Sequence, residues 1–284
     1  MKKAHFLIFA ACLSISLYGL EWPVANPVIY ASFAQRNIDI LNRGLILEKA
    51  DIVRASGDGV ILCTLSKKTN MSGFPGTLGN AVILAHEDKL VSVYGNLDSL
   101  DRVKEKKDIE NGSILGMTGS SAWGKPLQCI FQVYDSDRKN LLNPLMLLPA
   151  LPDSKGPVIR NVSAISSLGQ TIILGSSKTL RQGKYRIFAD ITDTMNASAT
   201  ELAPFRISIL VNGTEMVFLP FDLMQAENGI LMLTSGTSEK ELLEDPSRLY
   251  LGEIQLTRGR ADISILAQDF SGNERSVLFG LVIE

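Results

Sequence analysis

The phrases that bear on chemistry lie in the first half of the chain, and they carry amides, one carboxylate and an isoleucine. Gln35 and Asp39 open and close the phrase QRNID, Asn96 lies in YGNL, and Gln128 and Ile130 lie in LQCIFQV. Zinc prefers Cys, His, Asp and Glu ligands, whereas an amide oxygen is neutral and weakly basic and isoleucine has no ligand atom. These positions therefore suit hydrogen bonding to a peptide backbone better than metal-assisted hydrolysis.

Histidine, the commonest ligand of catalytic zinc, occurs twice in the chain, at His5 and His86. His5 lies in the apolar N-terminal segment, so His86 is the one imidazole left to activate a serine or cysteine nucleophile. On its alternating strand, His86 is predicted to be a surface or hydrogen-bonded histidine. A metal site made from Asp39, Cys129 and His86 is the alternative that stays open.

The N-terminus has the pattern of a secretory signal peptide. Two lysines precede the apolar run AHFLIFAACLSISLYGL, which is short for a membrane span. We predict a signal peptide at residues 1–22, cleaved after Ser16 or Gly19, and an exported chain without a membrane span, in the periplasm or cell envelope. An uncleaved anchor and lipidation at Cys12 are the alternatives. The net charge of −2 offers no basic surface for nucleic acid.

The elements that must position these residues are predicted to be strands. After residue 30, short segments alternate apolar and polar residues between Gly, Asn, Asp and Ser, and no long segment has a helical period. The segment 147–157, LLPALPDSKGP, is the predicted domain boundary. The short strand patterns that follow it predict a β-sandwich of immunoglobulin-like architecture, and Asn212-Gly213 predicts a hairpin turn. Cys63 and Cys129 lie in apolar strand patterns, where a disulfide and buried free thiols are both open.

Residues 35–145 resemble the LytM (lysostaphin-like) family of zinc endopeptidases, which cut peptidoglycan cross-links. QRNIDI resembles the family's H-x-G-[IV]-D phrase, and LQCIFQV stands where the family has H-L-H-F-E-V. Between them, IVRASGDGVIL, GNAVILAHEDKLVSVYGNL and VKEKKDIENGSILGMTGSS follow the family's order of strands and glycine turns. Asn143-Pro144 stands where the family has N-P.

The resemblance implies a zinc site in which most functional side chains have changed. The family holds zinc with two histidines and an aspartate, which correspond to Gln35, Ile130 and the retained Asp39. Its two catalytic histidines correspond to Asn96 and Gln128. The resemblance therefore implies an inactive homologue of a zinc metallopeptidase, with no bound metal and no other cofactor.

The fold we expect is all-β. A degenerate LytM-type domain of antiparallel sheet spans residues 23–150, and the immunoglobulin-like β-sandwich spans residues 156–284. The expected function is that of a non-catalytic envelope protein that binds peptidoglycan stem peptides or regulates a cell-wall hydrolase. A metallo-endopeptidase with rearranged zinc ligands and a structural scaffold in an envelope assembly are the alternatives.

The expected geometry of the site follows from the same correspondence. Gln35, Asp39, Asn96 and Gln128 should face one another across a groove, where their amides could bind peptide. The alternative is that these polar side chains only fill a dead site.

Overall fold

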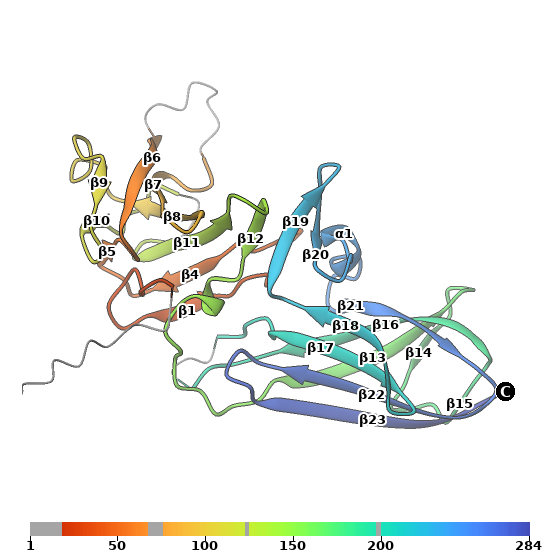
Figure 1. Ribbon diagram of the computed structural model, residues 1–284. Helices are drawn as coiled ribbons and strands as arrows, with labels where there is room; N and C mark the ends of the chain where they lie inside the picture. Colours follow the sequence, from red (N-terminus) through yellow and green to blue (C-terminus); the bar gives the residue numbers. More distant parts are fainter. Residues whose placement is uncertain (1–18, 68–75, 123–124, 197–199) are drawn as a thin grey trace, which may run out of the picture.

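The computed structural model describes residues 19–67, 76–122, 125–196 and 200–284, and its regular secondary structure is almost entirely β-strand (Figure 1). The predicted signal peptide, up to residue 18 and including Cys12 and Ser16, lies outside the described residues. Within the described ranges, no helix is long and apolar enough to cross a membrane.

The N-terminal part is organised by one large antiparallel sheet. Its strand order is β20-β19-β12-β11-β8-β7-β6-β9, while β4 pairs with β11 and β1 pairs with β4. The strands are β1 (Val28–Ala31), β4 (Leu45–Glu48), β6 (Gly59–Leu65), β7 (Asn80–Ala85), β8 (Leu90–Leu97), β9 (Asp108–Ile109), β11 (Gln128–Asp135), β12 (Asn140–Leu142), β19 (Leu223–Glu227) and β20 (Ile230–Leu233).

Two short strand pairs and a 3-10 helix complete this part. They are β2 (Arg36–Asn37) with β3 (Ile40–Leu41), β5 (Ile52–Arg54) with β10 (Ile114–Met117), and η2 (Pro144–Met146). The predicted alternation holds in β11, where Cys129, Phe131 and Val133 are fully buried in the core. Successive side chains in a strand point to opposite faces, so the residues between them face away from this core.

The C-terminal part contains two further sheets, ordered β14-β13-β16-β21 and β15-β23-β22-β17-β18. Their strands are β13 (Val158–Ser166), β14 (Thr171–Ile173), β15 (Thr179–Leu180), β16 (Gly183–Thr192), β17 (Arg206–Val211), β18 (Thr214–Pro220), β21 (Leu249–Leu256), β22 (Gly259–Gln268) and β23 (Glu274–Ile283), with the short helix α1 (Glu239–Leu242) before β21. Residues from both sheets, such as Ile187 and Ile263, form one core. The immunoglobulin-like relationship of these sheets stays a prediction.

The turn predicted at Asn212-Gly213 is present between β17 and β18. Both residues have positive φ, 51° and 80°. Asparagine and glycine tolerate this left-handed conformation better than other residues, which explains why the pair identifies the hairpin from sequence.

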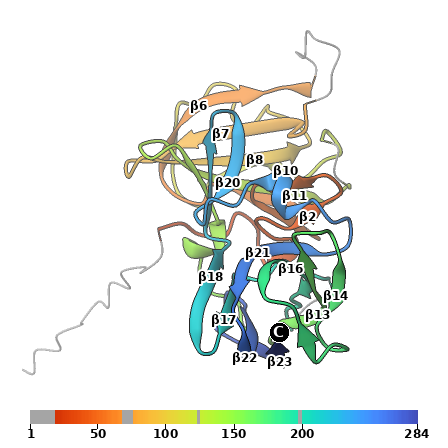
Figure 2. The ribbon, with the colours of Figure 1, turned by 90° about the vertical axis from the view of Figure 1, so that its right-hand side faces the viewer.

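Each part of the chain contributes segments to the sheet or the core of the other part. The β19–β20 hairpin belongs to the C-terminal half of the sequence, but β19 pairs with β12 and extends the first sheet (Figures 1 and 2). Phe33 and Leu41 pack into the core of the second part, and Leu202 packs into the first. The predicted domains, residues 23–150 and 156–284, therefore describe the order of the chain better than the division of its two cores.

Candidate functional site

Ile130 is the third residue of β11, where it faces away from the core. Its neighbours Cys129 and Phe131 are fully buried on the core side. In register, Ile130 is paired with Ile46 of β4 on one side and with Gly95 of β8 on the other. Directly paired residues point to the same face of a sheet, so the two isoleucines are neighbours on the outer face. Neither of them offers an atom that binds metal.

Gly44 fixes the chain just before β4 against β11. A Cβ atom at this position would come 2.2 Å from the carbonyl oxygen of Phe131 and 2.7 Å from Cγ of Gln132, so only glycine fits. Gly44 is the central residue of the phrase NRGLI, Asn42 to Ile46, which has the glycine that the family's H-x-G-[IV]-D phrase requires. In QRNID the corresponding residue is Asn37, which is exposed on β2.

Gln35 and Asp39 lie on a segment that contacts the second part of the molecule. The Nε2 group of Gln35 donates to the carbonyl oxygen of Glu201 at 2.8 Å. Asp39 is exposed in the turn between β2 and β3, where it borders a hollow formed with α1. The structure therefore does not bring these two residues together with Asn96 and Gln128, and the expected groove of four polar residues is not formed.

Asn96 is fully buried, and all its polar groups are used inside the protein. Its Nδ2 group donates to the carbonyl oxygens of Gly119, Lys125 and Gln128 at 3.1, 3.2 and 2.7 Å, and its Oδ1 accepts from the N–H of Ala122 at 3.0 Å. Asn96 therefore ties the loop before β11 to β8, and it has no polar group left to offer a ligand.

Gln128 is also used internally. It is 4% exposed, and its Oε1 accepts from the N–H of Lys125 at 2.9 Å. The residue paired with it on β4 is the half-buried Glu48. For Asn96 and Gln128 these contacts favour the alternative of a dead site in which former functional positions hold the loops together.

We expect Asn96→Ala to lower the free energy of unfolding by about 3 kcal/mol, because it leaves buried groups of the loop without partners and places alanine at a φ of 63°. Asn96→Gly should lose about 1 kcal/mol less, because glycine accepts positive φ. Asn37→Ala, on the exposed strand β2, is the control and should change stability by less than about 0.5 kcal/mol. Urea unfolding measures all three. A loss below about 1 kcal/mol in Asn96→Ala would contradict the role of Asn96 as a structural tie.

His86 belongs to an internal hydrogen-bond chain. Its Nδ1 lies 2.7 Å from the carbonyl oxygen of Asp58 and its Nε2 lies 2.8 Å from Oγ of Ser92. In the described ranges, His86, Cys129 and Asp39 form no group with ligand atoms close enough to share a metal. The alternative metal site at these three residues is therefore wrong.

Cys63 and Cys129, for which the sequence allows either a disulfide or free thiols, are both free thiols. Cys63 is exposed, whereas Cys129 is fully buried. Burial raises the pKa of the Cys129 thiol to about 12, so this side chain is neutral and packs as a small apolar residue.

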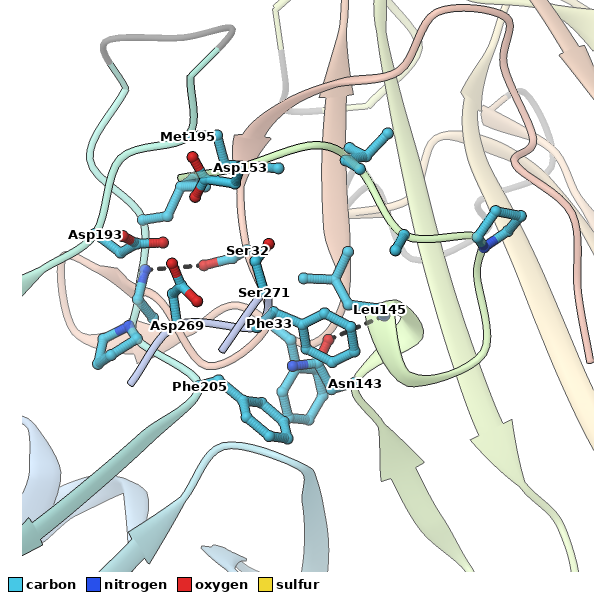
Figure 3. Close-up of a pocket in the computed structure, with 17 residues that line it drawn as sticks. Ser32, Phe33, Asn143, Leu145, Asp153, Asp193, Met195, Phe205, Asp269 and Ser271 are labelled. Carbon is cyan, nitrogen blue, oxygen red and sulfur yellow. Dashed lines mark hydrogen bonds between the residues drawn. The ribbon is translucent and has the colours of Figure 1, made fainter. Parts of the chain in front are cut away.

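One cluster of ionisable groups is visible only in the structure. Asp153, Asp193 and Asp269 place one carboxylate oxygen each within 4.8 Å of one another, and they line a small cavity of about 50 Å³ at the junction of the two parts (Figure 3). These aspartates come from three segments far apart in the sequence, and no short motif links them.

Comparison with known proteins identifies the first part of the chain. Residues 42–144 match the family model described as "Peptidase family M23", and residues 156–284 match a further family model. An uncharacterized protein of Treponema pallidum (strain Nichols) is 36% identical over 141 residues, which cover 44% of this chain and 96% of that protein.

Two solved structures are similar to this chain, one over about half of its length and the other over most of it. A chain in the SpoIIQ–SpoIIIAH pore-forming complex is 17% identical, with 47% of this chain and 92% of that chain covered and a TM-score of 0.37. The antimicrobial peptidase lysostaphin from Staphylococcus simulans is 14% identical, with 93% and 95% covered and a TM-score of 0.33.

Proposed function

Residues 42–144 of this chain belong to peptidase family M23, and we propose that this domain is a degenerate member that binds its target without cutting it. The observation that carries the proposal is the pair Ile46 and Ile130, which occupies the outer face of adjacent strands. If Asn42 to Ile46 is the equivalent of the family's H-x-G-[IV]-D phrase, Asn42, Ile46 and Ile130 stand at the three zinc-ligand positions.

The residues at these positions do not fit a zinc ion. Catalytic zinc takes about three His, Cys, Asp or Glu ligands and keeps one position open for water. Two of the three positions here are isoleucines, and the Nδ2 group of Asn42 already donates to the carbonyl oxygens of Ser32 and Gly44, both at 2.8 Å. The catalytic positions Asn96 and Gln128 hold no imidazole. The residues at these positions therefore do not support the alternative of a peptidase with rearranged zinc ligands.

The outer face around Ile46 and Ile130 has the features of a peptide-binding surface. Both isoleucines are partly exposed, and the half-buried Glu48 lies beside them on β4. At the rim, the Lys125 ammonium lies 5.0 Å from the centre of the Tyr30 ring. An apolar floor with a cation and an anion at its edge suits a short peptide that carries methyl groups and charged ends, as the stem peptides of peptidoglycan do.

Cell-envelope location completes the proposal. The predicted signal peptide and the LytM-type pattern support export, and the ligand class supports a place in the periplasm or cell envelope. A cell-wall hydrolase or another envelope protein is the partner through which such a domain would act. In the alternative role as a scaffold, peptide binding plays no part.

We expect the mature chain to sediment with purified peptidoglycan, and Ile130→Glu to weaken this binding at least about tenfold, because a carboxylate replaces the apolar floor. Lys125→Ala should weaken it several-fold without touching the core. The matched control is Leu278→Glu, which places the same charge at a side chain that is 68% exposed on β23 and should bind like the parent.

Three outcomes separate the roles. Binding that is lost in Ile130→Glu and Lys125→Ala but kept in Leu278→Glu supports the proposed surface. Equal binding by all variants would move the binding site elsewhere, and no binding by the parent chain would favour the scaffold. Release of soluble peptide fragments by the parent would overturn the non-catalytic assignment.

A further inference from the structure

Three aspartates from distant segments meet beside the linker between the two parts of the molecule. Asp153 lies in the linker, Asp193 directly follows β16, and Asp269 directly follows β22. Their carboxylate oxygens lie within 4.8 Å of one another, and Figure 3 shows the three side chains gathered at one end of the cavity. Like charges repel at this distance, so the arrangement needs a compensating partner.

Two of the three carboxylates are held in place by local N–H groups. Asp153 Oδ1 accepts from the backbone N–H groups of Ser154 and Asn196 at 2.9 and 3.0 Å. Asp269 Oδ1 accepts from the backbone N–H of Asn273 and its Oδ2 accepts from the Asn273 side chain, both at 2.8 Å. These bonds fix the positions of the two carboxylates before any ligand arrives.

The third carboxylate has an unpaired oxygen. Asp193 is 6% exposed, and its Oδ1 is buried without a hydrogen-bond partner. Burial, with added repulsion from Asp269 and Asp153, raises the pKa of Asp193 to about 7. The nearby ammonium of Lys155 donates to the carbonyl oxygen of Met195 at 3.5 Å, and no ion pair of Lys155 with the three aspartates is found in the described part of the chain.

We propose that Asp153, Asp193 and Asp269 bind a hard divalent cation, of which Ca²⁺ fits best. Carboxylate oxygens are the ligands that Ca²⁺ prefers, and its flexible coordination accepts water and carbonyl oxygens in the remaining positions. Zinc prefers sites that include nitrogen or sulfur ligands, and the three aspartates offer only oxygen. The bound ion ties the linker at Asp153 to the strand ends of the second part, so it fixes how the two parts are joined.

The experiment uses the full mature chain after treatment with EDTA and dialysis, and CaCl₂ as the probe. At pH 8 we expect calorimetry to show about one site per chain, and 1 mM CaCl₂ to raise the Tm by about 4 °C or more. Asp193→Asn should abolish both effects. Asp190→Asn, three residues earlier on β16, is the matched control and should respond like the parent.

Measuring the Ca²⁺ affinity at two pH values tests the alternative that a proton, rather than a cation, neutralises the Asp193 carboxylate. Because protons compete for this carboxylate, Ca²⁺ should bind about thirtyfold more weakly at pH 5.5 than at pH 8. Asp153→Asn, in the linker, keeps the test valid if Asp193→Asn does not fold, and it should also lose the Ca²⁺ response. The absence of any heat or Tm change with 5 mM CaCl₂ at pH 8 would overturn the proposal, as would an unchanged Ca²⁺ response in both variants. The result is independent of peptidoglycan binding by the first part.

Discussion

A chain carrying Asn42→His, Ile46→Asp and Ile130→His should bind zinc at about one ion per molecule, whereas the parent chain should bind none tightly. The three changes place two imidazoles and a carboxylate at the positions that we propose as the equivalents of the family's zinc ligands. Ile46 and Ile130 are directly paired across β4 and β11, so an aspartate and a histidine there would share the outer face. We expect an affinity for zinc at least about a hundredfold above that of the parent, measured by elemental analysis after dialysis and by titration.

The matched control decides between the two possible opening phrases. In Gln35→His with Ile130→His, the native Asp39 completes the same set of ligand types, but the structure keeps Gln35 and Asp39 on the segment that contacts Glu201 and α1. This variant should bind no more zinc than Ile130→His alone. Tight zinc binding by the control and not by the triple variant would show that QRNID is the true equivalent. One tightly bound zinc in the parent would show that the assignment as a metal-free domain is wrong.

Many strands and turns of the first part can be predicted from the sequence because their signals are local. Alternation of apolar residues predicts strands such as β11, and glycine turns between them follow the LytM order, so Asn96, Gln128 and Ile130 were found in neighbouring strands and loops. In the sequence, QRNID is an attractive match for the family's opening phrase because Asp39 retains the aspartate. The alternative phrase that we propose, Asn42 to Ile46, has its signal in Gly44, since the close approach to β11 tolerates no side chain there.

What the sequence could not predict depends on contacts between distant segments. The pairing of β19 with β12 joins a hairpin from the C-terminal half to the first sheet, and neither strand's pattern identifies its partner. The hydrogen bonds of Asn96 are equally hard to predict. Its side-chain amide makes four of them to a loop more than twenty residues away, and these decide whether the amide is free. Residue type suggested a binding group, and only the fold shows that this group is already occupied.

The carboxylate of Asp193 should make the protein less stable as the pH rises from about 5 to about 7 in the presence of EDTA. Its pKa is about 7 in the folded chain against an ordinary 3.8, so the folded state holds a proton in this range that the unfolded state has released. The stabilisation is fully present below about pH 4 and is lost as the pH rises through 7. The full slope of about 1.4 kcal/mol per pH unit levels off as the pH reaches the folded pKa, so the free energy of unfolding should fall by about 2 kcal/mol between pH 5 and pH 7.

The variant Asp193→Asn isolates this contribution, because its amide cannot titrate and its stability should be nearly constant over the same range. The carboxylates with lowered pKa values, Glu241, Glu244 and Asp245, lose their contribution only as the pH falls below about 4, so they do not interfere. Urea unfolding at pH 5, 6 and 7 gives the three free energies for each protein. Equal slopes in parent and variant would show that Asp193 is ionised in the folded state. If Ca²⁺ replaces the proton, 1 mM CaCl₂ should restore the stability of the parent at pH 7 and leave Asp193→Asn unchanged.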